Sequence, residues 1–273
     1  NMHFEVGDIN LKAVHELSEQ QAVTVRASYY DETSQVTYSG LTLAEWQADP
    51  YQNPFRNDEM DAQRFGTSAT HRFELSPAVT FLTNAYYTYF NRDWWRQSSN
   101  SNQRPNDRSD PNCGGMANLN TTCGNEGRLR QYWLAGVEPR VTVLHGLWGV
   151  ESTLEAGVRY HYEDQYRVQA NGDFPDSRSP GTGVNAGIRE DSDRNVEAMS
   201  AFVQNRFDLG RWSVTPGLRY EAIDYERIDN LLDTRGTSDV DELIPGLGAT
   251  YEALPGTVVF GGVHRGFAPP GVA

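Results

Sequence analysis

Arginine supplies nearly all the cationic side chains that this sequence could use for chemistry. Of 23 basic residues, all but one are arginine. Arg128 and Arg130 are two positions apart with Gln131 beside them, and Arg64 and Arg96 stand near the ends of other strand-like segments. A guanidinium group stays charged at any relevant pH, and its planar fork fits a carboxylate through two parallel hydrogen bonds. These five residues predict contacts to an anionic ligand. The alternative is that the arginines only pair with Asp or Glu of neighbouring segments.

The charge around these residues differs from that of the whole chain. The chain carries a formal charge of −14, with a pI near 4.8. The stretch from Arg92 to Arg130 instead has six arginines against four acids. Such a local positive region inside an acidic protein can attract an anion. The acidic balance and the lack of a basic arm exclude nucleic acid as an expected partner.

Two cysteines, Cys113 and Cys123, flank a short stretch of the same segment. Two sulfur ligands without a nearby histidine make a poor zinc site, which normally takes four nitrogen or sulfur ligands. We therefore expect a disulfide between them, as is usual in an exported, oxidising context.

The remaining metal-binding residue types are scattered. The histidines lie on different strand-like segments and form no H-x-x-H or H-E-x-x-H pattern. The acidic stretches 190–193 and 239–242 could supply oxygen ligands for Ca²⁺, but solvated loop acids are the simpler interpretation. The sequence therefore predicts no metal site and no cofactor.

Composition excludes several classes of protein. Aromatic residues at 11% give too much apolar surface for a disordered chain. No charge-free stretch approaches the roughly 20 residues of a membrane-spanning helix. The arginines must therefore be positioned by a fold that is neither disordered nor built on membrane-spanning helices.

Alternation of side chains identifies that fold. In residues 150–163, Leu154, Val158 and Tyr160 share one face, while Glu155 and Arg159 share the other. A period of two over so many residues indicates a β-strand. Strands are also predicted near residues 9–17, 23–30, 65–75, 79–89, 133–143, 199–207, 212–221 and 258–264. One or two helical turns are expected only at residues 41–46, capped by Thr42.

The connections between these strands alternate in length. Short turns are predicted near residues 18–21, 76–78, 145–149, 209–211 and 254–256. Long loops are predicted at about residues 31–61, 91–127, 164–195 and 226–242. The strands are also close to the 9–11 residues that a tilted membrane strand needs. Short turns at one end and long loops at the other favour an antiparallel, up-and-down transmembrane β-barrel over a soluble β-sandwich.

The two strand faces suit lipid and a wet lumen. We expect Leu154, Val158, Tyr160, Val141 and Val214 to face outward, because their faces are apolar. Aromatic residues border these faces, as at a lipid–water interface, and we expect them near residues 29–30, 86–89, 94–95, 160–162 and 212. The charged residues should face inward, and these are Glu155, Arg159, Arg140 and Arg219.

Several stretches resemble the β-barrel of TonB-dependent outer-membrane receptors. They are Y-S-G-L-T-L-A-E-W-Q-A-D-P at 38–50, N-R-D-W-W-R at 91–96, G-V-E-P-R at 136–140, P-G-L-R-Y-E at 216–221 and G-F-A-P-P at 266–270. The first and third are most similar to the ferric citrate receptor branch, although Tyr51 replaces an expected arginine. The resemblance covers nearly the whole chain. It implies that residues 1–273 are an internal fragment of the barrel domain, without the plug domain or the C-terminal strands. Counting the alternating segments predicts nine or ten strands in this piece.

The resemblance also implies a function. The full-length protein would be a receptor in the bacterial outer membrane, surrounded by outer-membrane lipid. It would bind an extracellular iron chelate of the ferric citrate type and import it with energy from the TonB complex, which acts through the plug domain. The arginines above would contact the chelate. A passive or selective porin is the alternative. An outer-membrane barrel enzyme is less expected, because only His3 and His161 lie near a predicted rim and neither has an adjacent Asp.

Overall fold

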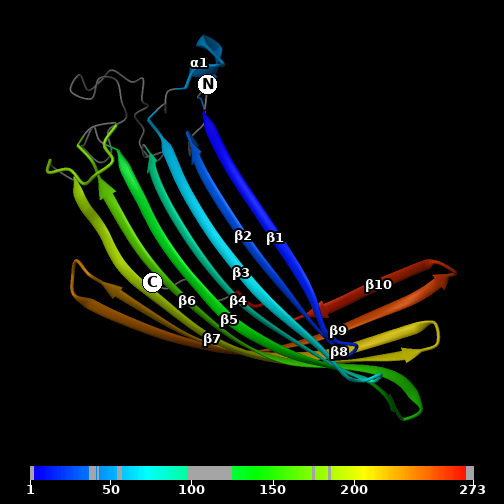
Figure 1. Ribbon diagram of the computed structural model, residues 1–273. Helices are drawn as coiled ribbons and strands as arrows, with labels where there is room; N and C mark the ends of the chain where they lie inside the picture. The colour runs from blue at the N-terminus through cyan, green and yellow to red at the C-terminus, as the bar shows by residue number, and fades with distance from the viewer. Residues whose placement is uncertain are drawn as a thin grey trace.

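Ten antiparallel strands form a single curved sheet in the computed structural model, which describes residues 3–36, 41, 43–53, 57–96, 125–173, 176–183 and 186–268. Each strand pairs with the next one in the chain, so the connectivity is up-and-down (Figure 1). The elements are β1 Phe4–Ser18, β2 Gln21–Ser34, α1 Leu43–Ala48, β3 Glu59–Ser76, β4 Val79–Arg96, β5 Glu126–Leu147, β6 Val150–Asn171, β7 Gly187–Leu209, β8 Trp212–Asp229, β9 Thr234–Leu254 and β10 Thr257–His264. The all-β prediction and the predicted strand count are confirmed.

The sheet is an open arc within the described residues. β1 and β10 form its two edges and do not pair with each other. Every residue of both strands is exposed. An unpaired strand edge is prohibitively costly in lipid, so we expect further strands to cover both edges in the membrane.

The two ends of the strands differ. At one end, called the turn end, two-residue turns join β1 to β2, β3 to β4, β5 to β6, β7 to β8 and β9 to β10. Trp148 and Gly149 both have positive φ, which is the geometry of the tight type I′ hairpin turn. The other end, called the loop end, carries α1 and the longer connections. The five predicted short turns are therefore confirmed.

Two of the four predicted long loops are wrong in length. β6 continues to Asn171 and β7 starts at Gly187, so their connection is residues 172–186 rather than 164–195. β8 and β9 are joined by residues 230–233 alone, rather than by 226–242. Strand pairing continues past Asp164 of β6 and Asp224 of β8, where the apolar outer face is interrupted. The acidic stretches 190–193 and 239–242 accordingly lie in β7 and β9, so their prediction as loop acids is wrong.

The outer face of the arc is apolar over its middle. Val158 and Tyr160 of β6, Met199 of β7 and Leu218 of β8 are exposed there. On β6 the apolar outer residues run from Leu154 to Tyr162, close to the span of about 9–11 residues that a membrane strand requires. The opposite, inner face carries Arg140, Arg159, Arg219 and Glu155, as predicted.

Aromatic rings flank this apolar band on the outer face. Tyr89 and Trp133 lie with ring centroids 5.5 Å apart on the loop side, and Trp212 and Tyr251 stack at 4.5 Å near the turn end. Some aromatic residues predicted to border the outer face instead lie on the inner face, because side chains alternate along a strand. Tyr86 bonds His161, and Tyr30 bonds Glu32, so both belong to the inner face.

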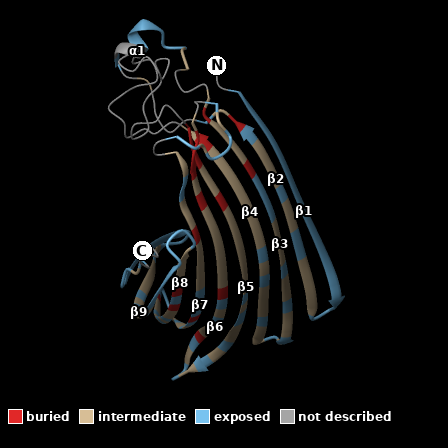
Figure 2. Cartoon of the chain, turned by 90° about the vertical axis from the view of Figure 1, so that its left-hand side faces the viewer, coloured by how far each residue is buried: buried red, intermediate tan, exposed pale blue. Residues whose placement is uncertain are grey.

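Burial increases toward the loop end (Figure 2). On the outer face there, Trp95, Val168 and Ala170 form a small buried cluster, against which Leu129 packs. Trp95 lies directly over Gly127, where an added Cβ would come within 2.9 Å of its ring. This cluster joins β4, β5 and β6 behind the inner-face residues described next.

No described helix is long or apolar enough to cross a membrane.

Candidate functional site

Arginines stand side by side across the inner face at the loop end. In the strand register, Arg92 of β4 is opposite Arg130 of β5, and Arg130 is opposite Arg167 of β6. Like charges directly opposite each other destabilise a sheet, so these residues need anions nearby. We call the surrounding group the mouth cluster. It consists of Arg92, Arg96, Arg128, Arg130, Arg167, Arg194, Glu126 and Glu190.

Glu190 of β7 lies between four of these arginines. Its Oε2 is 3.4 Å from Arg130 and 3.9 Å from Arg128. Its Oε1 is 3.6 Å from both Arg167 and Arg194. One carboxylate therefore links β5, β6 and β7.

Glu126 is the second acid of the mouth cluster. It lies 2.5 Å from Arg128 Nε and 3.4 Å from Arg96, which is on the neighbouring strand β4. The ring of Trp94 lies between Arg92 and Arg96, with guanidinium carbons 5.8 and 4.8 Å from the ring centroid. These contacts hold the arginine side chains of β4 against the sheet, since a cation over an indole face is attracted to it.

Arg130 forms the floor of the cluster. Its side chain is 3% exposed, and its Nη1 donates to the carbonyls of Leu129 and Val168, each at 3.1 Å. Burial, with Arg167 as the next cause, lowers the pKa of Arg130 to about 10. Burial and Arg167 also lower the pKa of Arg194. Burial is the main cause of both shifts, and the nearby charge of Arg167 adds to each.

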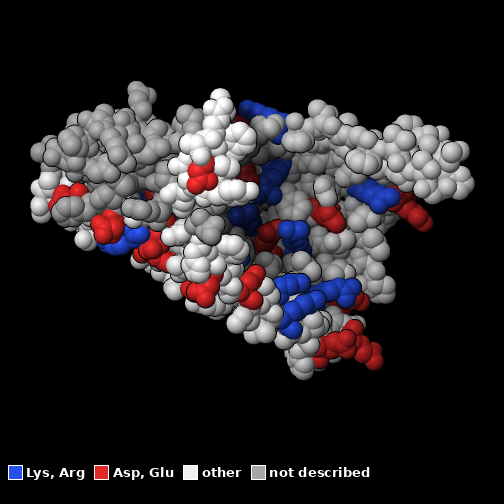
Figure 3. Space-filling view, turned by 90° about the horizontal axis from the view of Figure 1, so that it is seen from above, with Lys and Arg blue, Asp and Glu red and all other residues white. Residues whose placement is uncertain are grey.

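The mouth cluster therefore has an excess of positive charge. Six arginines against two glutamates leave a formal surplus of four on the described part of this inner surface. Figure 3 shows Lys and Arg side chains, with Asp and Glu among them, along the hollow of the arc when it is seen from above. Such a surface can hold an anion with several carboxylates through charge-assisted hydrogen bonds.

The connection between β6 and β7 extends from this site across neighbouring strands. Arg178 donates to Glu59 at the start of β3 and to the carbonyl of Asn57, both at 3.0 Å. Asp173 accepts from the backbone amides of Thr182 and Gly183, and these bonds lower the pKa of its carboxyl group. The connection is thus folded on itself and anchored to β3.

The structure brings together only part of the predicted site. Arg96, Arg128 and Arg130 belong to the mouth cluster. Arg64 is on the inner face but lower on β3, where its guanidinium lies over the ring of Tyr30 at 5.6 Å. Gln131 follows Arg130 in β5 and therefore faces the outer side, away from the arginines. Cys113 and Cys123, for which a disulfide is predicted, lie outside the described residues.

Sequence reasoning missed Arg92, Arg167, Arg194 and Glu190 as members of the site. The available signal was alternation. Arg167 continues the inner face of Arg159 along β6, and Arg194 continues the inner face of β7. Ending the predicted strands at residue 163 and starting them again at 199 placed these residues in a loop.

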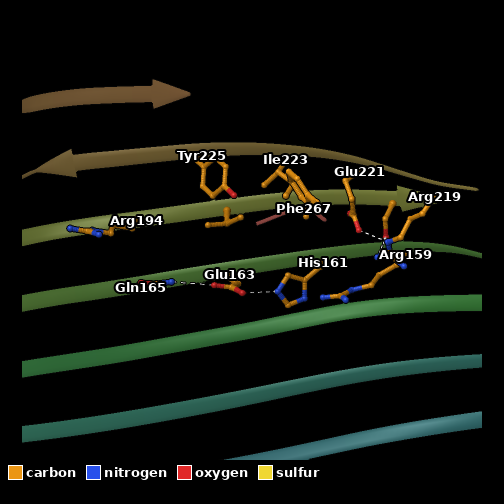
Figure 4. A pocket seen from close by; sticks show the side chains of 13 residues that line it. Arg159, His161, Glu163, Gln165, Arg194, Arg219, Glu221, Ile223, Tyr225 and Phe267 are labelled. Atoms are coloured by element: carbon orange, nitrogen blue, oxygen red, sulfur yellow. Dashed lines mark hydrogen bonds and ion pairs between the residues drawn. The ribbon is translucent and has the colours of Figure 1, made fainter. Parts of the chain in front are cut away.

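A hollow of about 480 Å³ lies on the inner face of β6, β7 and β8, closer to the turn end than the mouth cluster (Figure 4). Arg219 Nε is 2.5 Å from Glu221, and its Nη2 donates to Ser200. His161 Nε2 is 2.8 Å from Glu163, and its Nδ1 is 2.6 Å from the hydroxyl of Tyr86. His161 is therefore a wall residue rather than the rim residue that the enzyme alternative needs. The described residues contain no group of three His, Cys, Asp or Glu that could hold a metal ion.

Comparison with solved structures supports the same architecture. The chain is similar to a ferric citrate transporter in its unliganded form, FecA, with a TM-score of 0.80 and 19% identity over 96% of this chain. It is also similar to the ferric-catecholate import receptor Fiu of E. coli K12 in its open form (0.71, 10% identity, 98% of this chain). The siderophore receptor PiuA of Acinetobacter baumannii gives 0.69 with 11% identity over 93% of this chain. The chain spans 36%, 47% and 40% of those three proteins, respectively.

A family model provides the assignment. The model described as TonB dependent receptor-like, beta-barrel matches residues 11–273, which is nearly the whole chain. This family consists of transport receptors of the bacterial outer membrane. The chain belongs to the TonB-dependent receptor β-barrel family.

Proposed function

We propose that this chain forms part of an outer-membrane receptor that binds a polycarboxylate iron chelate of the ferric citrate type. In the full-length protein, the chelate would be imported with energy from TonB. The observation that carries the proposal is the mouth cluster, with its surplus of four positive charges at the loop end of the inner face.

The chemistry of such a chelate fits the residues. In ferric citrate the iron is already surrounded by citrate oxygens, so the receptor needs no metal ligands of its own. It needs cations that recognise the outward-facing carboxylates, and guanidinium groups are suited to this. The side chain of Arg128 is 29% exposed and therefore accessible to a ligand. The side chain of Arg130 is only 3% exposed and lies beneath the residues that a ligand would contact.

Titration of the purified full-length receptor tests the ligand class. We expect ferric citrate to bind more tightly than a neutral trihydroxamate iron chelate. Replacing Arg128 by Ala should weaken ferric citrate binding by about tenfold or more, since a charge-assisted contact contributes about 1.5–3 kcal/mol. Arg206→Ala is a matched control, because Arg206 pairs with Asp208 near the turn end and should leave binding unchanged. Equal affinity for both chelates, or an Arg128→Ala variant that binds normally, would contradict the proposal.

Uptake of radioactive iron tests the energy coupling separately. Cells that carry the full-length receptor should accumulate iron from ferric citrate only when TonB is present. Equal accumulation in a strain without TonB would favour a passive porin.

A further inference from the structure

Glu190 occupies the position that a bridging ligand carboxylate would take. Its two oxygens face four guanidinium groups, with Arg128 and Arg130 on one side and Arg167 and Arg194 on the other. A free anion entering the mouth cluster would approach the same four groups.

These contacts are loose for charge-assisted hydrogen bonds. The four nitrogen–oxygen distances are 3.4 to 3.9 Å, whereas a close pair has about 2.7–2.9 Å. Only the Arg130 contact meets hydrogen-bond geometry, and Ser192 donates to the other oxygen at 3.3 Å. One carboxylate has too few oxygens to satisfy four guanidinium groups, so a ligand with more carboxylates can bind them better.

The backbone around Glu190 is less regular than the backbone around most of its arginine partners. It lies beside the register shift between Gln169 and Ala170. It also follows Gly187, the first residue of β7, which has a positive φ of 86°. Three of its arginine partners belong instead to β5 and β6, whose pairing is regular around Arg128, Arg130 and Arg167. Glu190 thus belongs to an irregular strand start, whereas most of the arginines it contacts lie on regularly paired strands.

We propose that Glu190 is a built-in competitor for ligand carboxylates and sets the charge class of anion that the mouth cluster accepts. A ligand with one carboxylate replaces Glu190 with no net gain of charge pairing. A ligand with two or more carboxylates replaces it and also engages the surplus arginines. The inference deepens the proposed function and rests on it for the identity of the natural ligand.

Calorimetric titration of the full-length receptor with iron-free citrate, ferric citrate and sulfate tests this role. We expect Glu190→Gln to bind citrate about tenfold more tightly than the wild type, since the competing charge is lost. Sulfate, a compact anion that can take the place of Glu190 but reaches fewer of the other arginines, should gain more than citrate, so the preference for the polycarboxylate should shrink. Glu221→Gln is the matched control. It removes one inner-face carboxylate that pairs with the single arginine Arg219, and it should change neither affinity.

The outcomes separate this inference from the proposed function. A wild type that binds ferric citrate, with a Glu190→Gln variant that binds no more tightly, overturns the role of Glu190 alone. If Glu190→Gln gives the predicted gains for citrate and sulfate, but the wild type does not prefer ferric citrate to the neutral trihydroxamate chelate, the proposed function alone is overturned. The competitor role is overturned if Glu221→Gln gains as much anion affinity as Glu190→Gln. It is also overturned if neither the wild type nor Glu190→Gln binds an anion.

A structure of the ligand-loaded wild type tests the same point without any substitution, in case the variant does not fold. The Glu190 carboxylate should then have moved beyond 4 Å from at least two of its four arginines. Retention of all four contacts beside a bound ligand would overturn the proposal.

Discussion

Two regions on the inner face of β4 to β8 differ in their balance of charge. The mouth cluster has six arginines and two glutamates, so it keeps a positive surplus. The lower region, called the mid-wall, is close to neutral, with one more acid than arginine. The mid-wall residues are Arg140, Arg159, Arg219, Glu138, Glu155, Glu163 and Glu221.

The difference arises from whether each arginine pairs with an acid on its own strand or shares an acid with arginines of other strands. In the mid-wall the partners are two residues apart on one strand, as in Arg219 with Glu221 and Arg140 with Glu138. Each such pair is complete without a neighbouring strand. In the mouth cluster Glu126 also pairs with an arginine two positions away, Arg128, but it is shared with Arg96 of β4, and Glu190 alone serves four arginines. An acid that is shared among several arginines leaves part of their positive charge available to a ligand. An acid that pairs with a single arginine neutralises that charge.

The largest expected effect comes from removing shared arginines. The double variant Arg167→Gln, Arg194→Gln should weaken ferric citrate binding by about a hundredfold, because two charge-assisted contacts of about 1.5 kcal/mol each are lost. The mid-wall double variant Arg219→Gln, Glu221→Gln keeps the net charge and should bind normally. Titration of the full-length receptor compares the two. Similar losses in both would mean that the ligand contacts the mid-wall as well.

A smaller effect is expected on stability. Arg130→Ala should lower the free energy of unfolding by about 2 kcal/mol, because two buried carbonyl contacts are lost while only part of the like-charge repulsion is relieved. Arg219→Ala should cost less than about 1 kcal/mol, since that arginine is 39% exposed. Urea unfolding of the full-length barrel, followed by tryptophan fluorescence, measures both. If Arg130→Ala abolished binding at unchanged stability, Arg130 would be a ligand contact rather than a floor.

The same comparison explains what could be predicted from sequence. Over the mid-wall the outer face meets lipid, so apolar residues such as Leu154 and Val158 alternate with polar ones, and the faces follow directly. Beyond Tyr162 the apolar outer face is interrupted by Asp164 and, on the next strand, by Asp193, before Val168 continues it. Hydrogen bonding continues the strands there, but the hydrophobic period is broken at these two positions.

The candidate site was harder to predict for a related reason. Arg128 and Arg130 could be placed on one face because they are two residues apart. The partnership of Glu190 with arginines of β5 and β6 depends on the cross-strand register, and a slip of one residue would turn Glu190 to the other face. Without an apolar face to fix that register, sequence alone gave no reason to pair Glu190 with arginines up to 62 positions away.

Crowding of like charges at the loop end is not confined to the inner face, and this gives the smallest predicted effect. On the outer face, Asp61 of β3 is directly opposite Asp93 of β4, beyond the apolar band. Burial, and then the charge of Asp61, raises the pKa of the Asp93 carboxyl group above its usual value. The ionised carboxylate is therefore less favourable in the folded protein than in the unfolded chain.

The sign of the pH dependence follows from that shift. The cost of the charge is fully present above the folded-state pKa of Asp93 and disappears as the pH falls through it. Asp93→Asn should thus stabilise the full-length barrel at pH 7 by about 0.5 kcal/mol, and the gain should shrink as the pH approaches 4. Asp31→Asn is the control, because Asp31 faces Gly7 and Gln63 rather than another acid. Urea unfolding at several pH values measures the difference. A gain that is equal at pH 7 and pH 4, or shared by Asp31→Asn, would show that like-charge crowding at this end is limited to the arginines of the inner face.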